Sequence, residues 1–122
     1  LFRSVGADHP SDRLGEPLQD IPVDDPERVV FSEYHGHGAR ASAYMVRRGE
    51  WKLIYHPVAP NQLFDLRHDP DELRNVCEEN PDVAAELEAA LRSICDPEEE
   101  NLRADAFIRR QIEAAAAAGA NG

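Results

Sequence analysis

The sequence predicts an α+β fold: a small four-stranded antiparallel sheet packed by a C-terminal helix and followed by an extended helical tail. Two observations lead to this prediction. Between residues 28 and 66, short β-branched and aromatic runs are separated by turns that contain Gly or Pro. From residue 69 onward, Asp-Pro or Asn-Pro pairs precede stretches with helical spacing of apolar residues. Strands and helices therefore occupy separate halves of the chain.

The first 26 residues are rich in proline. Prolines at this density oppose both helices and central strands, so we expect residues 1–26 to form an extended lead-in. The prolines in question are Pro10, Pro17, Pro22 and Pro26. Leu14, Leu18 and Ile21 are the apolar side chains available to anchor such a segment.

Four short runs have the composition of strands. The first, RVVFSEYH at residues 28–35, is rich in β-branched and aromatic residues. Residues 44–47 and 51–55 form a predicted hairpin around a turn at 48–50, where Gly49 supplies the positive φ that tight turns often require. Trp51, Leu53 and Tyr55 share one face of the returning strand. QLFDL, at residues 62–66, is the fourth strand.

Two helices are predicted between the strands and the tail. Asp69-Pro70, with Glu72 three residues after Asp69, predicts a helix of about one turn. Asn80 is the predicted cap of a longer helix that begins at Pro81. The apolar residues of this longer helix recur at helical spacing and predict one packing stripe, formed by Val83, Leu87, Ala90, Leu91 and Ile94.

The tail repeats the same start signal. Asp96 precedes Pro97, and helix-favouring residues continue through five alanines to a stop at Gly119. The apolar stripe of this helix is thin, so its larger side chains are expected to expose apolar surface: Leu102, Phe107, Ile108 and Ile112. Such surface is typical of interfaces, and we expect a homo-oligomer that forms through the tail.

Composition limits the possible functions. The chain has 122 residues, enough for one domain, and 24 acidic against 13 basic residues give a net charge of -11. A surface of this sign repels phosphate backbones, so nucleic-acid binding is not expected. No run of 18 apolar residues predicts a membrane span. The chain begins at Leu1 rather than Met, so we expect a missing N-terminus. Cys77 and Cys95 are interpreted as half-buried reduced thiols.

His35 and His37 are the most conspicuous polar pair. An H-x-H pair in a strand can supply two ligands to a zinc ion, with Glu33 or His56 as a third. The same residues also fit a loop that faces a substrate, or an ordinary loop, and the bare pattern favours a loop over a metal site. No serine or cysteine has the glycine-flanked context of a nucleophile elbow. The residues alone therefore give no catalytic group and no complete metal site.

The order of three motifs resembles the C-terminal part of sulfatases of the alkaline phosphatase superfamily. The motifs are R-x-G-x-W-K-x-I at residues 47–54, L-F-D-L at 63–66 and D-P-x-E at 69–72. The later run ALRSICDPEEENLRADAFIRRQ is similar to the tail of choline sulfatases. On this resemblance, residues 1–26 lead in from a missing catalytic domain, residues 27–95 are the C-terminal α+β subdomain, and residues 96–122 are a choline-sulfatase-like helical tail.

The resemblance implies hydrolysis of a small sulfate ester, choline-O-sulfate to choline and sulfate, in the cytoplasm. It also implies a calcium-type divalent ion and a formylglycine made from a C/S-x-P-x-R motif. Neither Cys77 nor Cys95 has that context, so both groups are expected in the chain's own N-terminal catalytic domain and none in this segment. Tyr34, His35 and His37 would lie on a substrate-binding loop. Tyr34 and Tyr44 are candidates to hold the quaternary ammonium, or simply to pack.

Two other functions stay open at this point. A phosphonate or phosphate monoester hydrolase of the same superfamily would share the C-terminal architecture. An acidic interaction module without catalysis would also fit the composition. The sequence upstream of Leu1 distinguishes these possibilities from a sulfatase.

Overall fold

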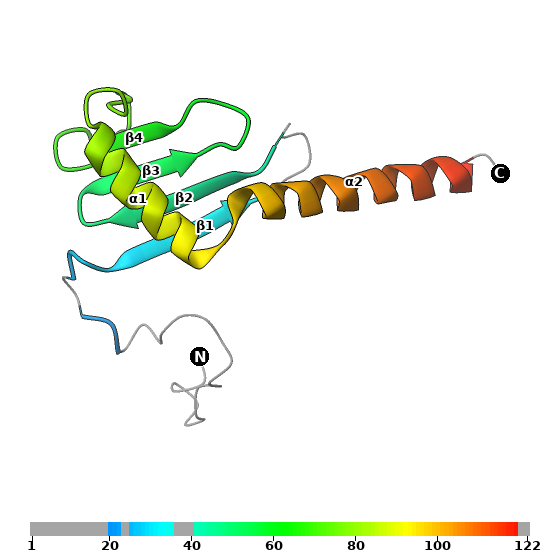
Figure 1. Cartoon of the computed structure of the whole chain (residues 1–122), viewed down its shortest axis with the longest axis horizontal. Helices are drawn as coiled ribbons and strands as arrows, with labels where there is room; N and C mark the ends of the chain where they lie inside the picture. The colour runs from blue at the N-terminus through cyan, green and yellow to red at the C-terminus, as the bar shows by residue number, and fades with distance from the viewer. Residues whose placement is uncertain (1–19, 23–24, 36–40, 120–122) are drawn as a thin grey trace.

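The computed structural model describes residues 20–22, 25–35 and 41–119, and within them the predicted α+β fold is confirmed (Figure 1). Four strands form one antiparallel sheet in the order β1-β2-β3-β4. Their bounds are β1 Val29–Tyr34, β2 Ala43–Arg48, β3 Trp51–Tyr55 and β4 Gln62–Asp65. Two helices follow, α1 Pro81–Ile94 and α2 Pro97–Gly119. Most of the predicted lead-in, including Leu14 and Leu18, lies outside the described residues.

The predicted hairpin joins β2 to β3. Its turn is one residue shorter than expected, because Arg48 still pairs with Trp51 and only Gly49 and Glu50 connect the strands. Gly49 has φ +57°, the left-handed conformation that favours glycine. A Cβ at this position would also lie 3.3 Å from the carbonyl oxygen of Pro26, so glycine fits both the turn and its neighbour.

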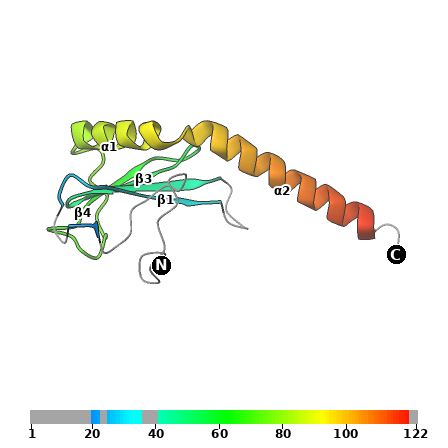
Figure 2. The ribbon, with the colours of Figure 1, turned by 90° about the horizontal axis from the view of Figure 1, so that it is seen from below.

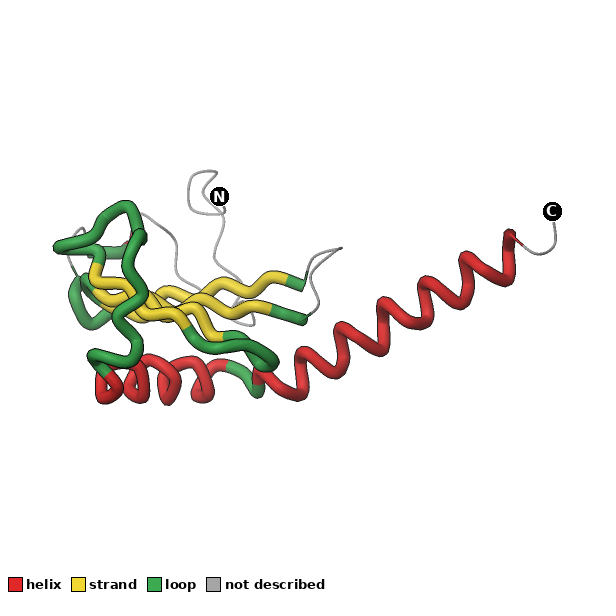
Figure 3. The backbone as a smooth tube through the Cα atoms, turned by 90° about the horizontal axis from the view of Figure 1, so that it is seen from above, coloured by secondary structure: helices red, strands yellow, loops and turns green. Residues whose placement is uncertain are grey.

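The core lies between α1 and one face of the sheet (Figures 2 and 3). Leu53 and Tyr55 point into it from β3 and Trp51 packs against its edge, which confirms the predicted common face. The buried members of the core come from β2, β3, β4 and α1: Tyr44, Val46, Leu53, Tyr55, Leu63, Leu87 and Leu91. Burial of each large apolar side chain contributes about 1.5–3 kcal/mol to folding, so this layer holds α1 on the sheet.

Two details of the predicted α1 are wrong. Ile94, the last residue of α1, is 44% exposed and does not join Leu87 and Leu91 in the core. The side chain of Asn80 makes no cap hydrogen bond and instead donates from Nδ2 to the carbonyl oxygen of Val76 at 3.1 Å. Pro81 at the first turn and Asp82 near the helix N-terminus are the start signals that remain.

The helical turn predicted after Asp69 is also wrong. The Asp69 carboxylate accepts the backbone N–H groups of Leu73 at 3.1 Å and Arg74 at 2.8 Å, as in a capped turn. Glu72, however, has φ +55°, and the chain continues without helix to residue 76. Leu73 is 84% exposed, so its side chain contributes little packing that could hold a helix here.

The α2 helix starts as predicted, because the Glu99 N–H donates to Asp96 Oδ1 at 2.9 Å. Beyond its first turn the helix runs away from the sheet (Figures 1 and 2). Among the described residues of α2, only Pro97 and Asn101 are buried. No helix in the described part of the chain has both the length and the apolar character needed to cross a membrane.

Candidate functional site

The candidate site lies where β1 ends, β2 begins and α2 starts. His35 directly follows β1, Ser42 directly precedes β2, and Asn101 lies in the first turns of α2. His35 Nδ1 lies 2.6 Å from Ser42 Oγ. The Ser42 backbone N–H donates to Asn101 Oδ1 at 2.8 Å, across 59 residues of sequence. Ser42 and Asn101 are both buried, so these polar groups satisfy each other away from water.

The His35 ring is fixed on two further sides. Its Nε2 lies 3.3 Å from Glu33 Oε2. Its ring meets the ring of Tyr44 edge to face, with centroids 5.7 Å apart and planes at 78°. The Tyr44 hydroxyl donates to the carbonyl oxygen of Pro97 at 2.9 Å, and burial raises the pKa of Tyr44. The start of α2 therefore supports both Ser42, which precedes β2, and Tyr44 in β2, and both of these residues contact His35.

A cavity of about 460 Å³ opens beside His35, between the end of β1 and one side of α2. Its wall is part polar and part apolar, with Glu33, His35, Glu100, Arg103, Ala104, Phe107 and Ile108. Arg103 is held by Glu99 at 3.2 Å and by Glu100 at 3.0 Å. This leaves the Glu33 carboxylate, the imidazole and the Phe107 ring as the groups best placed to meet a small polar molecule with an apolar part.

Two of the predicted loop residues, Tyr34 and His35, line different pockets. His35 lines the cavity, but Tyr34 is 59% exposed and lies on a shallow pocket of a different face of the sheet, with Met45 and Ile54. His37 lies outside the described residues. Tyr44, a candidate either to hold a cation or to pack, is fully buried and packs. Sequence reasoning did not identify the role of Asn101, because nothing local marks a partner 59 residues away.

Ser42, His35 and Glu33 are connected in the order of a serine–histidine–acid triad, but the arrangement lacks a usable nucleophile. Ser42 is 3% exposed and does not line the cavity. A substrate in the cavity would therefore meet the imidazole and the Glu33 carboxylate, not the hydroxyl. The geometry fits a group that positions His35 rather than a covalent catalyst.

The described residues do not fit a metal ion or a formylglycine. Across residues 20–22, 25–35 and 41–119, no group of three or more His, Cys, Asp or Glu side chains is arranged to hold a metal. The zinc alternative, His35 and His37 with Glu33 or His56, stays a prediction, because His37 lies outside the described residues. Cys77 and Cys95 are free and partly buried, as predicted, and burial raises the pKa of both thiols.

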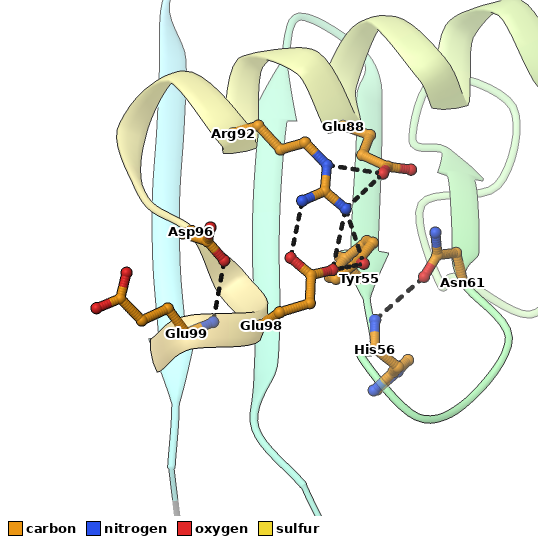
Figure 4. Close-up of polar contacts among 8 residues, drawn as sticks. All are labelled: Tyr55, His56, Asn61, Glu88, Arg92, Asp96, Glu98 and Glu99. Atoms are coloured by element: carbon orange, nitrogen blue, oxygen red, sulfur yellow. Dashed lines mark hydrogen bonds and ion pairs between the residues drawn. The ribbon is translucent and has the colours of Figure 1, made fainter. Parts of the chain in front are cut away.

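A second polar cluster fixes the direction of α2 (Figure 4). Arg92, near the end of α1, bonds Glu98 in the first turn of α2 at 2.8 Å, Glu88 at 2.9 Å and the Tyr55 hydroxyl at 3.0 Å. The Tyr55 hydroxyl also bonds Glu98. The hydrogen bonds from Arg92, and then from Tyr55, lower the pKa of Glu98 to about 2, while Glu98 and Glu88 raise the pKa of Arg92.

Comparison with known proteins gives relatives for about half of the chain. The chain is 49% identical over 70 residues to arylsulfatase K of Danio rerio, and this match covers 55% of the chain and 13% of that protein. It is 49% identical over 69 residues to arylsulfatase K of Mus musculus, covering 53% of this chain and 12% of that protein. The chain thus spans only about an eighth of the length of these relatives.

The other comparisons add less. No protein-family model matches the chain. A solved structure from a study of glycosaminoglycan metabolism in Bacteroides thetaiotaomicron is 31% identical over 43% of this chain and 14% of that chain, with a TM-score of 0.40. The arylsulfatase K relatives, together with the α+β architecture, support the interpretation of this chain as a sulfatase C-terminal subdomain.

Proposed function

We propose that this chain is the C-terminal part of a sulfatase that hydrolyses sulfate monoesters. The observation that carries the proposal is the near-50% identity to arylsulfatase K over 70 residues. Because the match spans 13% of that relative, most of an enzyme of this kind lies outside the matched segment. On this proposal, a calcium-type divalent ion and a formylglycine nucleophile belong to an N-terminal catalytic domain.

The chain's own contribution is to dock on that catalytic domain and to shape the substrate entrance. The sheet face opposite α1 supports docking, because the apolar side chains of Met45 and Ile54 are only half-buried there. The end of the sheet that carries His35 and its cavity is the part that meets substrate. In this role the imidazole supplies a hydrogen bond to the ester, and the cavity wall receives its non-sulfated part.

We propose two alternative substrates, choline-O-sulfate and an aryl sulfate. Choline-O-sulfate follows from the tail motif, and the Glu33 and Glu100 carboxylates with the Phe107 ring form a wall that suits an alkylammonium head. An aryl sulfate follows from the name of the relatives. Both esters carry one sulfate and an apolar group small enough for a cavity of about 460 Å³.

The test uses the full-length protein that carries this chain. Release of inorganic sulfate from choline-O-sulfate and from a chromogenic aryl sulfate is measured beside release of phosphate from phosphate and phosphonate monoesters. We expect sulfate release, and an increase in KM or a decrease in kcat/KM of about tenfold in His35→Ala, the loss of one charge-assisted hydrogen bond. Hydrolysis of phosphate esters alone would favour the related phosphomonoesterase. Absence of all four activities would contradict the proposal.

A further inference from the structure

The first turn of α2 makes contacts that a merely projecting helix does not need. Pro97 and Asn101 are the buried residues among those described in α2, and each accepts a hydrogen bond from β2 or its approach. The carbonyl of Pro97 accepts from the Tyr44 hydroxyl, and Asn101 Oδ1 accepts from the Ser42 N–H. Both donors belong to residues that contact the His35 ring. The helix start and the imidazole are therefore linked through two separate short paths.

These contacts also select a protonation form of the ring. When ionised, the Glu33 carboxylate only accepts hydrogen bonds, so its position 3.3 Å from Nε2 favours a hydrogen on that nitrogen. Nδ1 is then the acceptor for the Ser42 hydroxyl at 2.6 Å. Asn101 fixes the serine backbone and hence the place of the hydroxyl. The position of the His35 ring therefore depends on Ser42, and the position of Ser42 depends on Asn101.

We propose that Asn101 of α2 is a positioning residue for His35, holding the imidazole through Ser42 so that Nε2 meets Glu33 at the cavity wall. This rests on the proposed function only for its consequence in catalysis; the positioning itself is a property of the described residues. It gives the helical tail a role in the site, separate from the subunit interface that its exposed apolar residues predict. Groups of this kind, which orient a functional side chain from behind, set activity through geometry.

The experiment that tests this role compares Asn101→Leu with Asn101→Asp in the full-length protein. Leucine removes the acceptor for the Ser42 N–H, whereas aspartate keeps one. Gln111→Leu is the matched control, because it makes the same kind of change at an exposed position of α2. Hydrogen exchange of the Ser42 amide and the ¹⁵N shifts of the His35 ring are recorded in each, and kcat/KM is measured with the ester that is cleaved.

We expect Asn101→Leu to speed exchange of the Ser42 amide about tenfold, as for loss of one buried hydrogen bond, and to shift the ¹⁵N resonances of the His35 ring, because the Ser42 hydroxyl is no longer held at Nδ1. Asn101→Asp should stay closer to the parent, and Gln111→Leu should match it. Combined with His35→Ala, Asn101→Leu should cause no further loss of kcat/KM. Unchanged exchange in Asn101→Leu, equal exchange in the leucine and aspartate variants, or losses that multiply would overturn the proposal. A fully active His35→Ala with altered ring shifts in Asn101→Leu would instead overturn only the proposed substrate role of His35.

Discussion

The two helices of this chain are attached to the same sheet by different means. The 14-residue α1 lies along one face of the sheet and buries Leu87 and Leu91 there. The 23-residue α2 is longer, but within its described residues it buries only Pro97 and Asn101 and then leaves the body (Figure 1). Length and helix propensity therefore do not decide which helix belongs to the core.

The difference shows what each kind of attachment can do. Apolar packing spreads the attachment of α1 over several turns, so the position of α1 is part of the fold. Polar contacts concentrate the attachment of α2 in its first turn, through Tyr44, Ser42 and the cluster around Arg92. Such contacts fix a direction with little apolar burial. Substitutions in each helix test whether apolar packing of α1 contributes more to the free energy of unfolding than the polar contacts of α2.

The largest effect is expected for Leu87→Ala. Leu87 is 1% exposed, and removal of its side chain leaves a cavity between α1 and the sheet. The free energy of unfolding should fall by about 2–5 kcal/mol, measured by urea titration of Trp51 fluorescence. Ile94→Ala is the control from the exposed end of the same helix and should cost well under half as much. Equal losses in the two variants would show that α1 is not held by its buried stripe.

Tyr44→Phe is expected to rank second. It removes the buried hydroxyl that donates to the carbonyl of Pro97 and leaves the aromatic ring in the core. The cost should be about 1–1.5 kcal/mol in the same titration, with faster amide exchange at residues 97–101. Tyr34→Phe, at an exposed position, should change neither measurement. A large loss of stability without any change in exchange would mean that the hydroxyl supports the sheet and not α2.

The strand half of the fold could be predicted from sequence because its signals are local. Alternation in β3 places Leu53 and Tyr55 on one side, and Gly49 marks the turn through its positive φ. The same kind of local signal failed at Asp69, although Asp69, Pro70 and Glu72 match a helix start as well as Asp96 and Pro97 do. The two sites differ in the residues beyond the start signal. Only α2 continues into a long run of helix-favouring residues, whereas the segment after Asp69 is short and its Leu73 is 84% exposed.

The candidate site was predicted only in part, and for a physical reason. His35 stands out by its residue type, and it does line a cavity. Ser42 and Asn101 are ordinary polar residues that acquire a role only when the fold brings them together. Tyr34 is next to His35 in sequence but lines a different pocket, because neighbouring residues of a strand point to opposite faces of a sheet. Adjacency in sequence therefore does not imply a shared pocket, and separation in sequence hid the contact between Ser42 and Asn101.

A smaller, acid-dependent effect is expected for Glu98→Gln. Arg92 and Tyr55 lower the pKa of Glu98 from 4.5 to about 2 in the folded chain. Its stabilisation is thus fully present above about pH 4.5 and is lost as the pH falls toward 2. Because Arg92 and Glu98 are both more than one-third exposed, the contribution should stay below about 1 kcal/mol. The unfolding free energy of the parent, measured from about pH 5 to pH 2, should fall more steeply than that of Glu98→Gln. If the unfolding free energies of the parent and of Glu98→Gln change with pH in parallel, the cluster around Arg92 does not stabilise α2.

The smallest effect on stability is expected for a truncation that removes most of α2. Ending the chain after Arg103 removes most of α2, including Phe107 and Ile112, which are exposed. Because these residues bury little against the sheet, the unfolding free energy of the body should change by no more than about 0.5 kcal/mol. A loss comparable to that in Leu87→Ala would mean that the projecting part of α2 packs on the body after all.

The same deletion has its consequence in assembly. In the full-length protein, a homo-oligomer that forms through the exposed apolar residues of α2 should dissociate when they are removed. The mass in solution, measured by light scattering on parent and truncated protein, tests this directly. Phe107→Ser is the finer variant, because it changes one exposed apolar side chain and leaves the helix intact. If both variants keep the mass of the parent, the apolar side of α2 is not a subunit interface. The contribution of α2 is then limited to its start, where Asn101 bonds Ser42 beside His35.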